Sequence, residues 1–147
     1  MQHYKKSLLL TLYINRAAIA AWFIALPFIP FLARWYDAYS AKETIFVQFN
    51  VIVYLAMIPV FVILFLLNKL LTNISNEKFF EMQNVTILRV ISYACFALTV
   101  ISAVMIIWRL LAHLICLAFA FIGLLLRELK NVFEQAVILR EENDLTV

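Results

Sequence analysis

Residues 110–142 read LLAHLICLAFAFIGLLLRELKNVFEQAVILREE. Within this stretch Gly123 is the one residue that disfavours a helix, and a helix of this length would be about 48 Å long. The hydrocarbon core of a bilayer takes about 30 Å of that length. Because the first part is apolar and the second part is amphipathic, the stretch predicts a membrane span at residues 110–127 that continues as an arm at residues 128–147.

The composition of the whole chain also indicates a membrane protein. Of its 147 residues, 66% are hydrophobic and 14% are charged, whereas soluble domains are about half apolar and about a quarter charged. So short a chain cannot bury that many apolar side chains in a core of its own. A single Gly excludes a glycine-rich phosphate loop. The Lys and Arg residues are spread along the chain, so we expect no direct binding of nucleic acid.

Three other apolar stretches predict three more membrane spans, at about residues 14–35, 45–67 and 85–107. The first stretch could instead belong to a signal peptide, but it is longer than the roughly 7–15 apolar residues of such a segment. Pro27 and Pro30 should kink the outer half of this span, because proline cannot donate a helical hydrogen bond. The chain, residues 1–147, is therefore expected to form a single all-α domain, an integral membrane four-helix bundle.

The positive charges predict how this bundle is oriented. Nine Lys and Arg residues are expected on one side of the membrane: Lys5, Lys6, Arg16, Lys69, Lys78, Arg89, Arg127, Lys130 and Arg140. Three are expected on the other side: Arg34, Lys42 and Arg109. Because the side richer in Lys and Arg is the cytoplasmic one, we expect both termini, the connection at residues 68–84 and the extension of the fourth helix to be cytoplasmic.

Small residues at helical spacing predict where the spans pack closely, because packing joins helices in lipid. They are Ala17, Ala21 and Ala25 in the first span, Ser92, Cys95, Thr99 and Ser102 in the third, and Ala112, Cys116, Ala120 and Gly123 in the fourth. We interpret these stripes as interior seams of the bundle. The alternative for one of them is the interface of a homodimer.

Few residues within the spans could carry chemistry. Asn50 and Tyr54 are one helical turn apart, a spacing that fits either a structural hydrogen bond to a neighbouring helix or the lining of a polar pathway. The second, third and fourth spans contain no Asp or Glu, which argues against proton-coupled transport. His113 and Cys116 lack two further ligands for a metal ion. We predict no catalytic, cofactor or metal site, and no enzyme.

Apolar residues outside the predicted spans need a cover. The connection at residues 68–84 carries Phe79, Phe80 and Met82 among charges, and one face of the arm carries Leu129, Val132, Phe133, Ala136 and Val137. We expect the connection to be the main cover of the arm; a second copy, another protein or the lipid surface are the alternatives. From Glu134 onward the arm is acidic and should attract a basic partner. The predicted partner-binding residues are Phe79, Phe80, Phe133, Glu134, Glu141, Glu142 and Asp144.

Two segments carry a resemblance to a known family. They are NEKFFEMQNVTILRVISY at residues 76–93 and LKNVFEQAVILREENDLTV at residues 129–147, and they resemble the YoaS-like family of small bacterial four-span membrane proteins, a domain of unknown function. Members of that family often lie beside a gene for a very short helix-turn-helix regulator of the Cro/repressor type. The resemblance implies a protein of the bacterial plasma membrane that binds or restrains such a regulator. A small transporter or channel subunit acting as a homodimer, and a membrane immunity or stress protein, are the alternatives.

Overall fold

The computed structural model describes residues 2–39, 46–105 and 111–145, and nearly all of these residues are helical. In chain order the elements are α1 (Gln2–Ala25), the 3-10 turn η1 (Leu26–Phe28), α2 (Ile29–Tyr39), α3 (Phe46–Ser75), α4 (Met82–Val104) and α5 (Leu111–Leu145). There is no strand in the part of the chain that the structure describes. The predicted all-α helical bundle is confirmed.

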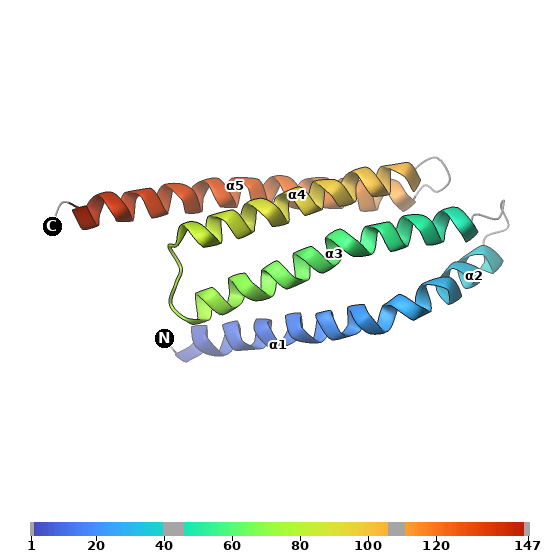
Figure 1. Cartoon of the computed structure of the whole chain (residues 1–147), viewed down its shortest axis with the longest axis horizontal. Helices are drawn as coiled ribbons and strands as arrows, with labels where there is room; N and C mark the ends of the chain where they lie inside the picture. Colours follow the sequence, from blue (N-terminus) through green and yellow to red (C-terminus); the bar gives the residue numbers. More distant parts are fainter. Residues whose placement is uncertain (1, 40–45, 106–110, 146–147) are drawn as a thin grey trace.

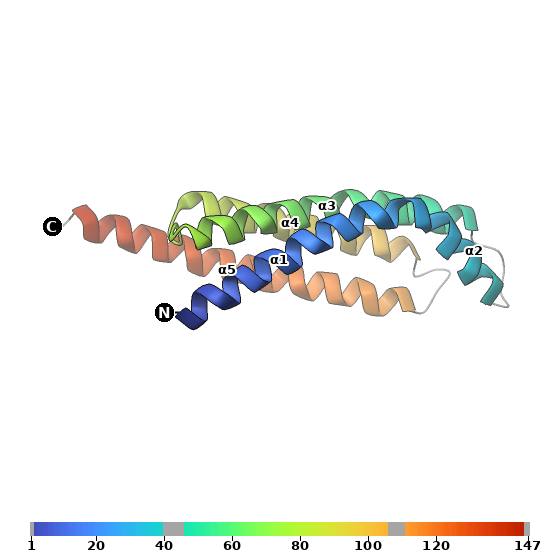
Figure 2. The same cartoon turned by 90° about the horizontal axis from the view of Figure 1, so that it is seen from below.

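The helices pack in the order in which they follow one another along the chain. The helix α1 lies against α3, α3 lies against α4, and α4 and α5 run side by side along most of their length. Figures 1 and 2 show this arrangement from two directions. The start of α1, the α3–α4 connection and the end of α5 lie at the same end of the bundle (Figure 1).

The predicted proline kink is confirmed. The helix α1 ends at Ala25, one 3-10 turn containing Pro27 follows, and the chain resumes as α2. The helix α1 is fixed to α3 by the side-chain amide of Asn15, which donates to the carbonyl oxygen of Leu64 at 3.1 Å. The rings of Trp22 and Phe61 add a contact between these helices, with centroids 4.8 Å apart.

The seam between α4 and α5 is formed by the small residues that the sequence predicts. The hydroxyl of Ser92 donates to the backbone carbonyl oxygen of Gly123 at 2.8 Å. The thiol of Cys116 donates to the backbone carbonyl oxygen of Thr99 at 3.5 Å. A Cβ added to Gly123 would lie 3.3 Å from the Cβ of Cys95. A glycine is therefore what allows the two backbones to approach so closely. The side chain of Ala112 lies outside the described residues.

The prediction for the small residues of the first span is wrong. Ala17 and Ala21 are exposed and Ala25 is half-buried, so this stripe is not an interior seam. The reason is that α1 turns its larger side chains toward α3. Asn15 and Trp22 reach that helix through the hydrogen bond and the ring contact described above.

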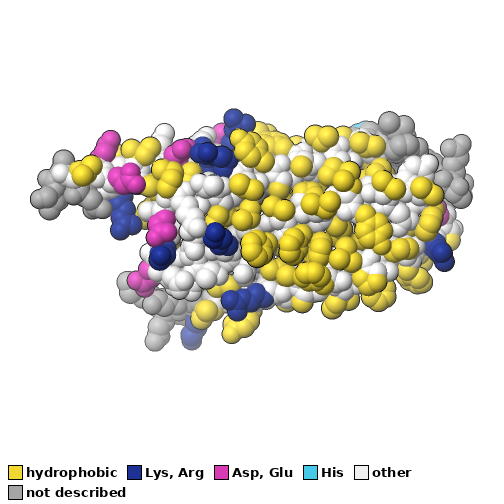
Figure 3. All heavy atoms as spheres, viewed as in Figure 1, with side chains coloured by type: hydrophobic (Ala, Val, Ile, Leu, Met, Phe, Trp, Pro, Cys, Tyr) yellow, Lys and Arg dark blue, Asp and Glu magenta, His cyan; other side chains and the backbone are white. Residues whose placement is uncertain are grey.

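Three helical segments among the described residues are long and apolar enough to cross a membrane: Lys6–Ala38, Phe46–Ser75 and Met82–Val104. They contain most of the spans predicted at residues 14–35, 45–67 and 85–107. The span predicted at residues 110–127 begins in part outside the described residues, and its described part is the apolar first half of α5. Apolar side chains cover the surface along the middle of the molecule (Figure 3), where a lipid environment would solvate them.

A candidate docking site at the charged end of the bundle

Charged side chains gather at the end of the bundle where both termini lie (Figure 3). We call this region, made of the start of α1, residues 76–81, the start of α4 and the second half of α5, the charged end. It contains every residue that the sequence predicts to bind a partner. The geometry of the charged end therefore decides which of these residues are exposed to a partner.

The connection between α3 and α4 is held by one buried side chain. Asn84 is 0% exposed, and its amide nitrogen donates to the carbonyl oxygens of Lys78 at 2.6 Å and Phe79 at 3.0 Å. Its amide oxygen accepts a hydrogen bond from the side chain of Asn73 at 2.8 Å. A fully buried asparagine with both ends bonded fixes the backbone around it. The connection is thus an ordered part of the charged end.

The end of α3 has the hydrogen bonds of a Schellman motif. The backbone N–H of Lys78 donates to the carbonyl of Asn73 at 3.0 Å, and that of Glu77 donates to the carbonyl of Ile74 at 3.1 Å. The left-handed residue that such a motif requires is usually glycine, but here it is Glu77, with φ 62°. The turn is therefore formed at some cost in backbone strain.

Phe80 of the connection contacts Phe133 of the arm, as the sequence predicts. Their ring centroids are 6.4 Å apart, and Phe133 also packs against the core cluster that contains Leu88 and Ile91. Phe79 is half-buried. The contact joins the connection to α5 and makes the charged end one packed unit.

The connection, predicted to be the main cover of the arm, covers only part of its apolar face. Leu129 is 44% and Val132 is 63% exposed, whereas Val137 is 2% exposed. The helix α5 turns Phe133 and Val137 toward α4, and the short connection reaches only that edge of the face. Apolar surface is therefore left open at the charged end.

The acidic residues of the arm differ in their contacts with α4 and in their exposure. The carboxylate of Glu134 accepts a hydrogen bond from Lys130 at 2.7 Å and lies 3.5 Å from the guanidinium of Arg89. The hydrogen bond and charge of Lys130, with the charge of Arg89, lower the pKa of Glu134. Glu141 and Glu142 are exposed, and the side chain of Asp144 lies outside the described residues. Glu134 thus belongs to the α4–α5 seam, while the exposed carboxylates lie further along.

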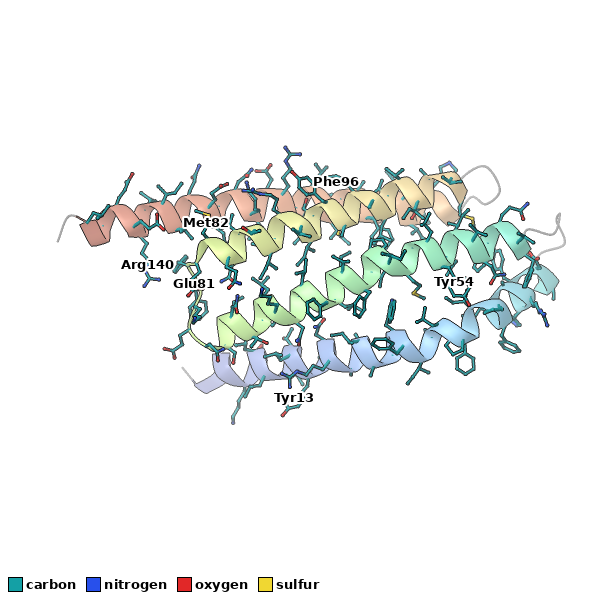
Figure 4. The ribbon with its side chains drawn as sticks, viewed as in Figure 1. Tyr13, Tyr54, Glu81, Met82, Phe96 and Arg140 are labelled. Atoms are coloured by element: carbon teal, nitrogen blue, oxygen red, sulfur yellow. The ribbon has the colours of Figure 1, made fainter. Side chains whose placement is uncertain are left out.

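The last turns of α5 extend past the start of α4 (Figures 1 and 2). Figure 4 shows Arg140 on this projecting part, beyond Glu81 and Met82 at the start of α4. Ile138 and Leu139 are exposed there, Leu139 to 64%. A projecting helix end with exposed apolar and acidic side chains is a surface that a partner could bind.

A second feature of the charged end is a pocket that the sequence analysis missed. We call it the basic pocket; it has a volume of about 140 Å³ and is lined by Arg89, Ser92 and Tyr93 of α4 and by Arg127, Lys130 and Asn131 of α5. Each helix contributes residues i, i+3 and i+4, which share one helical face. That repeated spacing is the sequence signal. It becomes informative only when α4 and α5 are known to be antiparallel neighbours.

No metal centre is found among the described residues, where no group of three or more His, Cys, Asp and Glu is placed to hold an ion. The chemistry of the charged end is therefore that of carboxylates, cations, amides and aromatic rings. Such groups bind partners and charged ligands through hydrogen bonds and ion pairs.

The fold and the charged end define an all-helical protein with helices suited to a lipid environment. In a comparison with protein families, the family described as "Protein of unknown function (DUF2975)" matches residues 34–147. The chain belongs to that family. No curated protein and no solved structure matches the chain.

Proposed function

We propose that this protein is a four-span protein of the bacterial cytoplasmic membrane, of the YoaS-like type, whose charged end binds or restrains a small helix-turn-helix regulator in the cytoplasm. The observation that carries the proposal is the projecting end of α5, which exposes Ile138 and Leu139 beside the carboxylates of Glu141 and Glu142. The two segments that resemble the YoaS-like family lie in this same region and include the arm.

A fourth span is supported by the position of α5. Its first half lies along α4, which is itself long and apolar enough to cross a membrane. Apolar side chains of this half are exposed, among them Leu114, Leu117 and Phe121. Because these residues lie at the level of the apolar part of α4, the same lipid that surrounds α4 would solvate them.

A cytoplasmic charged end is supported by the distribution of positive charge. Lys and Arg side chains gather toward this end of the molecule (Figure 3), and Arg89, Arg127 and Lys130 line one pocket there. The side of a membrane protein that is rich in Lys and Arg is the cytoplasmic one. A regulator that binds DNA is available on that side alone.

The chemistry of the arm fits a basic partner. From Glu134 onward the chain has four acidic residues and one basic residue, Arg140. The surface of a DNA-binding helix is rich in Lys and Arg, which would be attracted to the exposed carboxylates. A regulator held there would lose contacts with DNA phosphates, because the same cations make both sets of contacts. Binding at the arm would thus restrain the regulator.

The transporter alternative has less support from the geometry. A cavity of about 410 Å³, formed by residues of α2, α3, α4 and α5, is lined almost entirely by apolar side chains such as Ile52, Val60 and Leu98. A path for a polar solute needs polar groups along it. No specific observation favours the immunity or stress alternative.

The test is co-purification of a small helix-turn-helix regulator, the kind of partner that the resemblance to the YoaS-like family implies. The tagged full-length protein and a variant lacking residues 141–147 would be extracted from native membranes at low and at moderate salt. We expect the full-length protein to retain the regulator, more so at low salt because exposed charges are screened by salt. We expect the truncated variant to insert into membranes and to release the regulator.

The matched control separates charge from the mere presence of the arm. In this variant Glu141→Gln and Glu142→Gln keep the length and shape of α5 and remove two charges. Loss of the regulator in both the truncated and the neutralised variants supports docking on the acidic arm. Equal retention by the truncated variant at both salts would show that the arm is not the docking element. Absence of the regulator from every sample would favour the transporter alternative.

A further inference from the structure

Among the described residues that line or contact the basic pocket, positive charges outnumber negative ones. Three cations line it, Arg89, Arg127 and Lys130, and one carboxylate, that of Glu134, pairs with two of them. Within the described part of the chain Arg127 has no ion pair. The guanidinium of Arg127 is therefore available to an anion that enters from outside.

The position of the basic pocket along the bundle identifies where that anion would come from. On α5, Arg127 lies within one helical turn of Leu124 and Leu125, which are more than half exposed. On α4, Tyr93 is 61% exposed and lines the pocket one helical turn after Arg89. Tyrosines of this kind mark the interface between hydrocarbon and headgroups. The pocket thus lies where the lipid-facing surface ends and the charged end begins.

We propose that the basic pocket binds the phosphate group of an anionic phospholipid, whose chains lie along the exposed apolar side chains beside it. Guanidinium groups bind phosphate oxygens through paired, charge-assisted hydrogen bonds. Asn131 and Tyr93 supply neutral donors in the same pocket. Basic pockets between membrane helices are a known form of headgroup site. This site does not depend on the docking of a regulator.

The close packing of α4 and α5 keeps the pocket in shape. The hydrogen bond from Ser92 to Gly123 at 2.8 Å fixes the register of the two helices at the edge of the pocket. Lys130 pairs with Glu134 of the same helix at 2.7 Å, and Glu134 also lies 3.5 Å from Arg89 of α4, so this carboxylate links the two sides of the pocket. Both halves of the pocket are thus held in place before a ligand arrives, and this lowers the entropy lost on binding.

The experiment uses the full-length protein in a neutral detergent. Phosphatidylglycerol, phosphatidylcholine or inorganic phosphate is added, and the melting temperature and the lipid bound in native mass spectrometry are measured. We expect phosphatidylglycerol to raise the melting temperature more than phosphatidylcholine does, and inorganic phosphate to have little effect. Arg127→Gln should weaken the binding of phosphatidylglycerol at least about tenfold, the effect of losing a charge-assisted contact.

Arg140→Gln is the matched control, because it removes the same charge from the same helix outside the pocket. It should bind phosphatidylglycerol as the wild type does. Should Arg127→Gln fail to fold, two other measurements replace it. Asn131→Ala, in the same pocket, should bind phosphatidylglycerol more weakly than the wild type does. The wild type itself should bind this lipid more weakly as the salt concentration rises. Equal losses in Arg127→Gln and Arg140→Gln, or equal binding of the two lipids, would overturn the proposal. Stabilisation by inorganic phosphate without any effect of phosphatidylglycerol would overturn it in favour of a soluble phosphate ligand.

Discussion

The hydroxyl of Tyr54 on α3 donates a hydrogen bond to the carbonyl oxygen of Leu26, 3.2 Å away in the turn between α1 and α2 (Figure 4). In an uninterrupted helix that carbonyl would accept the N–H of residue 30. Residue 30 is proline and has no N–H. Tyr54 thus supplies a donor from a neighbouring helix, as one of the two interpretations of its sequence position predicts, whereas the amide of Asn50 bonds its own helix at Phe46.

We predict that Tyr54→Phe lowers the free energy of unfolding in mixed micelles by about 0.6 to 1 kcal/mol, the usual size of a hydrogen bond between membrane helices. Pro30→Ala restores the α-helical N–H donor that proline removes at residue 30. In the Pro30→Ala background the loss of the hydroxyl should therefore cost less. If Tyr54→Phe lowers stability equally in the wild type and in Pro30→Ala, the hydroxyl of Tyr54 does not replace the backbone donor that proline removes.

The left-handed conformation of Glu77 allows a test of the α3–α4 turn. We predict that Glu77→Ile lowers the free energy of unfolding by about 1–2 kcal/mol relative to Glu77→Asn, because a β-branched residue is strained at positive φ and asparagine tolerates it. Both changes remove the carboxylate, so their difference measures the backbone alone. Thermal unfolding in detergent gives the comparison. Equal stability of the two variants would mean that the turn relaxes to another conformation.

A larger side chain should lower stability when it is placed in the α4–α5 seam, but not when it is placed on the exposed face of α1. Gly123→Leu would drive a side chain against Cys95, whose Cβ lies 3.3 Å from the first added carbon, and overpacking typically costs about 1–3 kcal/mol. The control is Ala21→Leu, at an exposed position of α1, which we expect to leave the melting temperature unchanged. A loss of stability in Ala21→Leu would show that α1 packs against something that this chain alone does not provide.

The turn and the seam also show what the sequence could predict. The break at Pro27 depends on the chemistry of one residue, and the seam at Gly123 depends on the size of residues one turn apart. Both are local properties of the sequence, so residue type and spacing were sufficient to predict them. The same argument failed for Ala17 and Ala21, because small residues permit close packing but do not say which face of a helix meets a neighbour.

The basic pocket could not be predicted for a related reason. Arg89 and Arg127 lie on different helices, and they share a pocket only because α4 and α5 pack in one particular register. That register is set by the contact of Ser92 with Gly123. The sequence placed both arginines on the same side of the membrane but gave no distance between them. The exposure of Val132 was missed likewise, since it depends on the rotation of α5 about its axis.

The rotation of α5 can be tested with two neighbouring residues. Phe133 packs against Phe80 and the core cluster, whereas Val132 is largely exposed. We predict that Phe133→Ala lowers the free energy of unfolding by about 3 kcal/mol, near the lower end for buried phenylalanine. Val132→Ala should change it by less than about 0.5 kcal/mol, as is usual for surface positions. The reverse order in a denaturation series would show that α5 presents its other face to α4.

The ion pairs of Glu134 predict a dependence of stability on pH. Its pKa is lowered in the folded protein by the hydrogen bond and charge of Lys130 and by the charge of Arg89. A carboxylate of this kind stabilises the fold above its unfolded pKa, about 4.3 for glutamate. That contribution is lost as the pH falls through the lower folded value, because protonation ends the pairing.

We therefore expect the wild type to be more stable than Glu134→Gln near neutral pH, and this difference to disappear as the pH falls from about 5 to about 3. Melting temperatures across this range provide the measurement. Glu141→Gln, at an exposed position of the same helix, should follow the wild type throughout. A difference between wild type and Glu134→Gln that stays constant down to the lowest pH would mean that the effect comes from packing, and that the pairing with Lys130 and Arg89 does not stabilise the charged end.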